Sequence, residues 1–298
     1  MAEQVLLDRL GFGPGVIDGR PGSFLVQAVK GFQQSQGIAP TGSLDPVTTK
    51  ALAPFAGTPA TVDVTLTQAD LAGPFVGPIP HDPAEQAKLP AMGYADAIEE
   101  LAERYHTTKP TLIALNGADP LKPGAKIHVP NVVPAKSDYP AGLKPEWKAM
   151  LAQLSVSSDQ PVAAKIVVDK SDKMLRVYDA QDKLVAQFPA TMGSEHDPLP
   201  IGNWKIQGTS YLPSFHYNPQ LFWDAKPGDI KETLKPGPNG PVGVVWMDLD
   251  KEHYGIHGTP TPETIGRTTS HGCIRLTNWD AARLSLMVKP GTPAIFQE

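Results

Sequence analysis

Proline interrupts this chain so often that a fold built on long, continuous helices is excluded. The 298 residues include 32 prolines and 27 glycines, which break helices and form turns. Hydrophobic residues make up 41% of the chain, and a chain of this length can bury at least one sizeable core. The sequence therefore predicts one large domain or two to three smaller ones, joined by short, stiff connections.

Charge argues against nucleic acid as the main partner, and hydropathy argues against a membrane-spanning helix. The formal net charge is -5 at pH 7 and the Lys and Arg residues form no runs, so nucleic acid is not expected as the main partner. No apolar run approaches the roughly 18 residues that a membrane span needs, so we expect no transmembrane helix. The first residues show no charged segment followed by an apolar one. We expect either a cytoplasmic protein or one whose signal or anchor is absent from this chain.

Residues 1–55 have the pattern of a small helical unit. Apolar residues recur at helical spacing on both sides of the turn GFGPGVIDGRPG, and Ser23 and Gly37 are suited to start and end the second helix. The segment resembles the peptidoglycan-binding type 1 module in its Leu-Gly pair, its Gly-x-x-Asp-Gly turn, its helix ending in Phe-Gln and its later Thr-Gly pair. The resemblance implies a three-helix wall-binding module. An unrelated three-helix bundle would not require these residues at these places.

Residues 61–134 contain an amphipathic helical stretch, YADAIEELAERY, then TTKPTLIALNGA and the closing segment LKPGAKIHVPN. This order resembles a LysM glycan-binding module and implies a βααβ unit. A proline-rich insertion, GPFVGPIPHDPAEQAKLPAMG, stands where the first strand of that family runs directly into its turn. Residues 135–160 are expected to form a linker with one short helix.

The pattern changes to strands over residues 161–298. Short segments alternate apolar and polar residues between turn residues such as Asp182 and Gly193, which predicts a mainly β domain. One helix is expected near its end, with Asn278 as the N-cap. Residues 211–243 are long for a structureless connection, so we expect a lid or a binding loop there. The predicted fold class is a multidomain α+β protein with a helical N-terminal module and a mainly β C-terminal domain.

Cys273 is the only cysteine, and it follows a His-Gly pair. A thiol attacks as thiolate, so catalysis requires a nearby base and donors for the oxyanion that forms. Gly272 permits a tight turn that directs local backbone amides at that oxyanion, and His257 is the candidate base. Two other interpretations stay open: Cys273 as a small buried hydrophobe, or as a zinc ligand with His253 and His257. The β-like spacing does not favour zinc, and no metal or other cofactor is expected.

The whole stretch HGTPTPETIGRTTSHGCIRL resembles the signature of the L,D-transpeptidases, the YkuD-type catalytic domain. That signature is His-Gly, a loop, and then Ser/Thr-His-Gly-Cys, a hydrophobic residue and Arg or Asn. The resemblance implies that Cys273 is the nucleophile, that His257 is the general base, and that the Gly258 carbonyl orients the imidazole.

The same resemblance assigns supporting roles to the neighbouring residues. It implies that His271 and Gly272 shape the site, that Ser270 contacts substrate, and that Arg275 holds a substrate carboxylate or the local loop. A second stretch, TMGSEHDPLPIGNWKIQG, resembles the family's glycine turn and the strand after it, although Leu199 replaces a family Thr. For Trp223 and Trp246 we expect that at least one packs in the core.

The resemblance implies a cysteine acyltransferase that acts on peptidoglycan. The thiol would attack a tetrapeptide stem, release D-Ala and form a thioester; an amine acceptor would then take the acyl group, giving a 3→3 cross-link or attaching a wall protein. Water as acceptor would make it an L,D-carboxypeptidase or a hydrolase, and a non-catalytic wall-binding protein is the other alternative. The expected partners are stem peptides and glycan strands, the expected place is the periplasm or cell wall, and the thiol is an expected carbapenem target.

Overall fold

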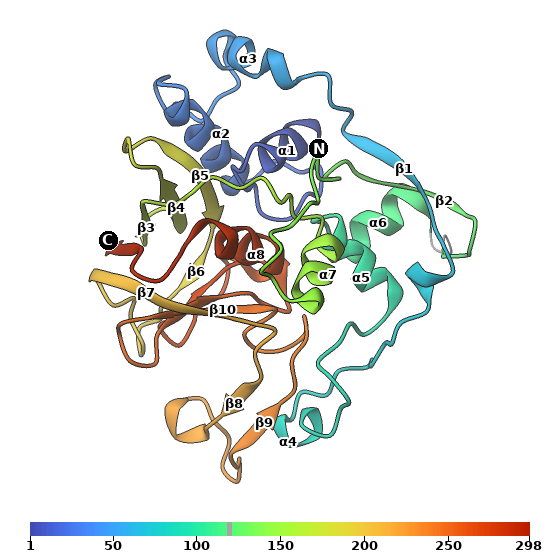
Figure 1. Cartoon of the computed structure of the whole chain (residues 1–298), viewed down its shortest axis with the longest axis vertical. Coiled ribbons are helices and arrows are strands. Elements are labelled where there is room, and N and C mark those ends of the chain that lie inside the picture. Colours follow the sequence, from blue (N-terminus) through green and yellow to red (C-terminus); the bar gives the residue numbers. More distant parts are fainter. Residues whose placement is uncertain (118–120) are drawn as a thin grey trace.

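The computed structural model describes residues 1–117 and 121–298 and has three parts (Figure 1). They are an N-terminal helical unit, a middle α/β unit and a C-terminal β domain. Residues 118–120 fall in the predicted LysM-like module, and the predictions about them lie outside the described residues. The prediction of a helical N-terminal region and a mainly β C-terminal domain is confirmed. In the described ranges, no helix is both long and apolar enough to cross a membrane.

Three short helices form the N-terminal unit. They are α1 (Ala2–Arg9), α2 (Ser23–Ser35) and α3 (Pro46–Leu52), followed by the 3-10 turn η1 (Ala53–Phe55). Ser23, the predicted N-cap of α2, is instead its first helical residue, because the extended Gly22 takes the N-cap position. Gly37 follows α2 with φ 68°, the left-handed conformation that commonly ends a helix. The core of this unit includes Leu7, Phe12, Ala28, Val29, Phe32 and Leu52.

The middle unit pairs its first and last strands around two helices. Its elements are β1 (Thr61–Thr65), η2 (Ala69–Leu71), α4 (Pro83–Gln86), α5 (Ala97–Arg104), α6 (Lys109–Asn116) and β2 (Lys126–Pro130). The two strands are antiparallel, with Val62 opposite Val129. Their apolar side chains share one core with α5 and α6 and with two residues of the N-terminal unit, Val5 and Ile17. The proline-rich insertion runs from η2 through α4 to α5.

The C-terminal domain is built on a nine-stranded sheet in the order β5-β4-β3-β13-β7-β10-β11-β12-β6. Its strands are β3 (Lys165–Asp169), β4 (Met174–Tyr178), β5 (Leu184–Pro189), β6 (Thr191–Met192), β7 (Gly202–Tyr211), β10 (Val245–Leu249), β11 (Gly255–His257), β12 (Ile274–Arg275) and β13 (Pro293–Gln297). The short helix predicted before this domain is α7 (Pro145–Gln153), and η4 (Pro262–Thr264) lies between β11 and β12.

Helix α8 (Asn278–Met287) lies between the sheet and the other two parts of the molecule (Figure 1). Thr277, rather than the predicted Asn278, is its N-cap, because the Thr277 hydroxyl accepts the Asp280 amide at 3.2 Å. The side chain of Asn278 points elsewhere: its Oδ1 accepts the Val244 amide at 3.2 Å. Nearly every residue of α8 is buried, and the helix contacts both other parts: Arg283 donates to Asp8 of the N-terminal unit, and Trp279 stacks on His106 of the middle unit.

The N-terminal unit covers the exposed edge of the sheet. β5 is an edge strand, and the chain around Phe12 runs parallel to it. Gly13 donates its amide to the Gln187 carbonyl at 2.7 Å, and the Gln187 amide donates to the Gly11 carbonyl at 2.9 Å. These bonds satisfy backbone groups that an open edge would leave unpaired.

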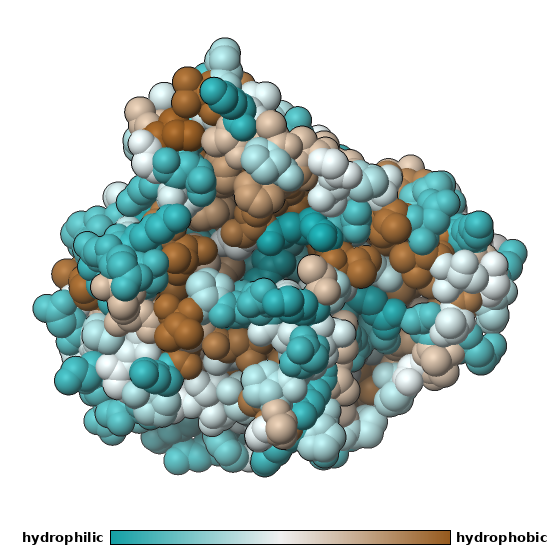
Figure 2. Space-filling model, turned by 45° about the horizontal axis from the view of Figure 1, so that its top comes forward, coloured by the Kyte–Doolittle hydropathy of each residue, from teal (hydrophilic) through white to brown (hydrophobic). Residues whose placement is uncertain are grey.

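The long segment before β10 folds into a small sheet of its own. Its elements are β8 (Phe215–Tyr217), η3 (Pro219–Leu221) and β9 (Glu232–Leu234), and they project beside α4 (Figure 1). The Met92 amide donates to the Pro236 carbonyl at 3.1 Å, which joins this segment to the middle unit. The face of the molecule in Figure 2 mixes hydrophilic and hydrophobic residues and is hollowed near its centre, where hydrophilic residues gather.

Candidate active site

A parallel strand pair brings the predicted nucleophile and base together. Strands β11 and β12 are parallel neighbours, with His257 opposite Arg275 in the register. Register partners point to the same face of a sheet, so His257 and Arg275 share one face, and Cys273 lies immediately before β12. The charge of Arg275 acts on both Cys273 and His257, which agrees with this proximity.

His257 is held in one orientation. Its side chain is buried, with 4% of the residue exposed, and its Nδ1 lies 2.7 Å from the Gly258 carbonyl oxygen. A carbonyl only accepts, so Nδ1 carries the proton and Nε2 is left as the basic nitrogen. Trp246 stacks on the imidazole, with ring centroids 5.3 Å apart and an angle of 18° between the planes. The ring therefore has little freedom to turn.

Burial disfavours the charged forms of the His257 imidazole and the Cys273 thiol. Burial is the main reason that the pKa of His257 is lowered to about 3; the Arg275 charge also lowers this pKa, and the Gly258 hydrogen bond raises it. Burial also raises the pKa of the Cys273 thiol, which outweighs a backbone hydrogen bond from Gly255 and the Arg275 charge. The thiol donates to the His253 carbonyl at 3.7 Å. The thiol and the imidazole are therefore both neutral near pH 7.

Two glycines are required by close contacts at the site. Gly272 has φ 91°, and a Cβ there would clash with the ring of Tyr254. A Cβ on Gly258 would clash with the side-chain amide of Asn278. The turn before Cys273 and the turn after His257 therefore both depend on glycine.

Ser270 is buried and hydrogen-bonds to the backbone of Cys273 and of Gly193. Only 3% of the residue is exposed, and its hydroxyl accepts the Gly193 amide at 2.7 Å and donates to the Cys273 carbonyl at 2.6 Å. The Ser270 amide also donates to the Gly193 carbonyl at 3.0 Å. These bonds tie the Cys273 turn to the glycine turn after β6, so this geometry favours positioning over the predicted substrate contact.

Arg275 and His271, which are each two positions from Cys273 in the chain, have different polar partners. Arg275 donates from Nη1 to the Thr269 carbonyl at 3.2 Å, and no carboxylate among the described residues forms an ion pair with it. His271 donates from Nε2 to Asp224 Oδ1 at 2.8 Å. The Phe222 ring meets His271 edge to face, at 4.9 Å between centroids.

The rings of Phe222 and Trp223, called here the aromatic cover, pack against His271, and the sequence does not predict which residues form this cover. Trp223, next to Asp224, stacks on His196 with centroids 4.3 Å apart, so residues 222–224 bridge to the turn after β6. The length of the segment between β7 and β10 was the only sequence signal for this cover. The expectation that Trp223 or Trp246 packs in the core is wrong. Trp223 is 55% exposed, Trp246 lies on His257, and the fully buried tryptophans are Trp147 and Trp279.

The sequence left two other interpretations of Cys273 open: a small buried hydrophobic residue, or a zinc ligand together with His253 and His257. Among residues 1–117 and 121–298, no group of three or more His, Cys, Asp or Glu side chains is arranged to hold a metal. His253 faces solvent beside Glu252, at 3.5 Å, and offers Cys273 its carbonyl rather than its ring. The Cys273 residue keeps some exposure to solvent, which a fully packed core cysteine would not have.

Comparison with known proteins identifies two segments. The chain matches the L,D-transpeptidase catalytic domain over residues 163–296 and a peptidoglycan-binding domain over residues 3–52. The putative L,D-transpeptidase YkuD of Bacillus licheniformis is 31% identical over 137 residues, which cover 46% of this chain and 67% of that protein. YkuD of Bacillus subtilis is 51% identical over 55 residues, or 18% of this chain and 34% of that protein.

Solved structures of L,D-transpeptidases are similar to a part of this chain. An L,D-transpeptidase from Mycobacterium smegmatis is 22% identical, with a TM-score of 0.37, and the alignment covers 45% of this chain and 58% of that chain. The catalytic domain of the L,D-transpeptidase of E. faecium is also 22% identical, with a TM-score of 0.33, over 45% of this chain and 95% of that one.

Proposed function

Since this chain belongs to the L,D-transpeptidase family, we propose that it cross-links peptidoglycan through a thioester on Cys273. The observation that supports the proposal is the parallel pairing of β11, which ends at His257, with β12, which directly follows Cys273, together with the 2.7 Å contact of His257 Nδ1 with the Gly258 carbonyl. The substrate is a tetrapeptide stem, the leaving group is its terminal D-Ala, and the acceptor is an amine of another stem.

The first half-reaction makes the thioester. The thiol proton passes to Nε2 of His257 as the sulfur attacks the carbonyl carbon of the third stem residue. The backbone amides of residues 272 and 273 stabilise the oxyanion that develops on that carbonyl. The bond to D-Ala then breaks, and His257 returns the proton to the leaving amine.

The second half-reaction transfers the acyl group. The acceptor amine attacks the thioester carbonyl and loses a proton to His257, and the sulfur leaves from the tetrahedral intermediate and recovers that proton as a thiol. A neutral imidazole is needed at the start of each half-reaction, and the lowered pKa of His257 keeps the imidazole neutral near pH 7. Arg275 has a guanidinium that suits a stem carboxylate.

The N-terminal parts would hold the enzyme on its polymeric substrate. The N-terminal unit matches the peptidoglycan-binding family, and the β1-α5-α6-β2 order of the middle unit supports a LysM-like, glycan-binding role. Two wall-binding units raise the effective concentration of stems at the thiol without new contacts in the active site. This substrate places the protein in the periplasm or the cell wall.

The proposal is tested with a disaccharide-tetrapeptide substrate and mass spectrometry. We expect a cross-linked dimer with loss of D-Ala, and a mass adduct on Cys273 after exposure to a carbapenem. Neither should form with Cys273→Ala, and both should form very slowly with His257→Gln. A product that is only tripeptide would show that water is the acceptor. Equal activity of wild type and Cys273→Ala would disprove the mechanism.

A further inference from the structure

A trough between the three parts of the molecule runs along the loop that joins the two catalytic segments. It consists of two adjoining cavities of about 340 and 790 Å³. The wall that both cavities share, called here the shared wall, contains Val16, Asp18, Arg20, Pro262, Glu263 and Arg267. None of these residues belongs to the catalytic set described above, so the trough is a separate feature of the surface.

Each part of the chain contributes a side of the trough. The Asp-Gly-Arg turn that marks the N-terminal unit supplies Asp18 and Arg20. The loop between His257 and Ser270 supplies Glu263 and Arg267. The start of α6 in the middle unit supplies Lys109 to the larger cavity. A ligand in the trough would therefore touch the wall-binding unit and the active-site loop at once.

The charges of the trough suit a ligand with both carboxylate and amino groups. Arg20 and Arg267 are exposed, and neither forms an ion pair with any of the described residues. A guanidinium binds a carboxylate through two parallel hydrogen bonds, so two unpaired arginines on one wall suit a ligand with carboxylates. Asp18 and Glu263 lie on the same wall, where they suit ammonium groups and repel a polyanion.

The backbone that carries Arg20 is anchored before any ligand arrives. The Gly19 amide donates to Gln4 Oε1 at 2.7 Å, and Gln4 Nε2 donates to Asp18 Oδ1 at 3.0 Å. Ile17, just before this turn, donates its amide to the His106 carbonyl of the middle unit at 2.8 Å. The turn is thus clamped between two parts of the molecule.

The backbone that carries Arg267 is anchored in the same way. The Gly266 amide donates to Thr191 Oγ1 at 2.7 Å, and Lys173 Nζ donates to the Gly266 carbonyl at 2.7 Å. Gly266 has φ 70°, and a Cβ there would clash with the ring of Phe24, so α2 packs directly on this loop. A wall with a preset backbone loses little conformational freedom on binding.

We propose that this trough binds a peptide stem of peptidoglycan, with Arg20 and Arg267 pairing with the carboxylates of the stem. The inference rests on the proposed function only for its substrate class, since a stem peptide carries both free carboxylates and amines. A strand held here would be tethered beside the loop whose ends carry His257 and Ser270. It would thereby present further stems of the same polymer to the thioester.

The test measures binding in the full chain carrying Cys273→Ala, so that no turnover occurs. The ligand is disaccharide-tripeptide, which lacks the D-Ala leaving group, and its affinity is measured by calorimetry. We expect Arg20→Ala and Arg267→Ala each to weaken binding by about tenfold, the effect of about 1.4 kcal/mol. Lys183→Ala, which removes an exposed positive charge outside the trough, is the matched control and should bind as the parent does.

A second ligand tests whether the arginines recognise carboxylates. Disaccharide-tripeptide with its carboxylates amidated should bind the parent about tenfold more weakly than the unmodified ligand does. The arginine variants should bind this amidated ligand with the same affinity as the parent. Arg267→Lys keeps the charge without the two-point geometry and should bind with an intermediate affinity; thermal melting shows that each variant is folded.

Three results would overturn the proposal: no measurable binding to the parent, equal affinities of the arginine variants and Lys183→Ala, or equally tight binding of a glycan without peptide. The carbapenem adduct on the wild-type thiol is an independent readout. Its absence would count against the proposed function and leave the binding result to stand by itself.

Discussion

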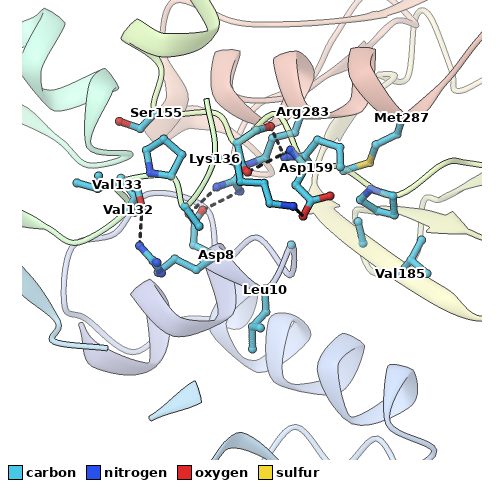
Figure 3. Close-up of a pocket in the computed structure, with 18 residues that line it drawn as sticks. Asp8, Leu10, Val132, Val133, Lys136, Ser155, Asp159, Val185, Arg283 and Met287 are labelled. Carbon is cyan, nitrogen blue, oxygen red and sulfur yellow. Dashed lines mark hydrogen bonds and ion pairs between the residues drawn. The ribbon is translucent and has the colours of Figure 1, made fainter. Parts of the chain in front are cut away.

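Asp8 in α1 and Arg283 in α8, which are 275 residues apart in the chain, form a buried two-point ion pair (Figure 3). Nη1 donates to Oδ1 at 3.1 Å and Nη2 donates to Oδ2 at 2.7 Å. His106 of the middle unit adds a third contact, from Nδ1 to Asp8 Oδ2 at 3.0 Å. One carboxylate thus joins all three parts of the molecule, beside a cavity of about 250 Å³.

Replacing Asp8 should therefore loosen the whole assembly. Burial alone would raise the pKa of Asp8, but the charges of Arg283 and His106 hold it well below its usual range, so the carboxylate is ionised. Asp8→Ala leaves Arg283 buried without this partner, and we expect the free energy of unfolding to fall by about 3–5 kcal/mol in urea denaturation. Glu3→Ala, on the exposed side of the same helix, should change it by less than about 0.5 kcal/mol. A similar small change for Asp8→Ala would contradict the structural role of the pair.

The acylation rate should be insensitive to mild acid. Because burial lowers the pKa of His257 from 6.5 to about 3, the imidazole remains able to accept the thiol proton well below neutral pH. We expect carbapenem acylation of Cys273, followed by stopped-flow or mass spectrometry, to stay nearly constant from about pH 7 to about pH 5. A fall of about 25-fold over this range would show that the base titrates near its ordinary pKa. In His257→Gln the slow residual rate should instead rise with pH, as free thiolate forms.

The aromatic cover over His271 should decide how much water reaches the thioester. Asp224 Oδ1 accepts from His271 at 2.8 Å, and the neighbouring Trp223 stacks on His196. Closing contacts of this kind exclude water from a reactive intermediate. We expect Trp223→Ala to raise the ratio of tripeptide to dimer by about twofold or more in the product assay. Leu221→Ala removes an equally exposed apolar side chain of the same segment and should leave the ratio unchanged; an equal shift in both variants would refute the role of Trp223.

Glu103 should make the protein less stable as the pH rises. Burial raises its pKa to about 7, against hydrogen bonds from Tyr94 and Asn278 that lower it. The folded state therefore holds this proton more tightly than the unfolded state, so the stabilisation is complete below about pH 4 and is lost as the pH rises toward 7. We expect Glu103→Gln to reduce the fall in unfolding free energy between about pH 5 and pH 8 by on the order of 2 kcal/mol.

The matched control for Glu103→Gln is Glu146→Gln, an exposed carboxyl in the first turn of α7. Its pH dependence should follow that of the wild type. Asp280, whose pKa burial also raises to about 7, retains its own contribution in both variants. Parallel curves for wild type and Glu103→Gln would show that Glu103 does not titrate in this range.

The family and the residues that define it could be predicted because their signals are local. The Asp18-Gly19 turn and the run from Ser270 to Arg275 each need particular residue types within a few positions, since a tight turn or a thiol beside a basic ring allows few substitutes. Comparison with relatives confirms the catalytic family and the N-terminal module. The individual roles of Cys273 and His257 remain predictions for the experiments above.

Other parts of the site could not be predicted, because they depend on residues far apart in the chain. Strand order and the path of a long segment decide these contacts. They are the stacking of Trp246 on His257, the hydrogen bond between His271 and Asp224, and the hydrogen bond between Ser270 and Gly193. Local periodicity carries no information on which distant side chain will cover a given residue. The predicted N-caps Ser23 and Asn278 are each one residue too late, since Gly22 and Thr277 are the N-caps in the structure. In both cases either of two adjacent residues suited the N-cap position.

The sequence by itself determined the division into helical and β parts, the family, and the pairing of one thiol with one candidate base. Only the tertiary structure decided that this base is neutral, that the thiol is not ionised at rest, and that three units share one buried carboxylate. It also decided that Arg20 and Arg267, which lie near opposite ends of the chain, line the same trough. The physical reason is that burial and electrostatic interactions depend on distance in space, and the fold alone sets those distances.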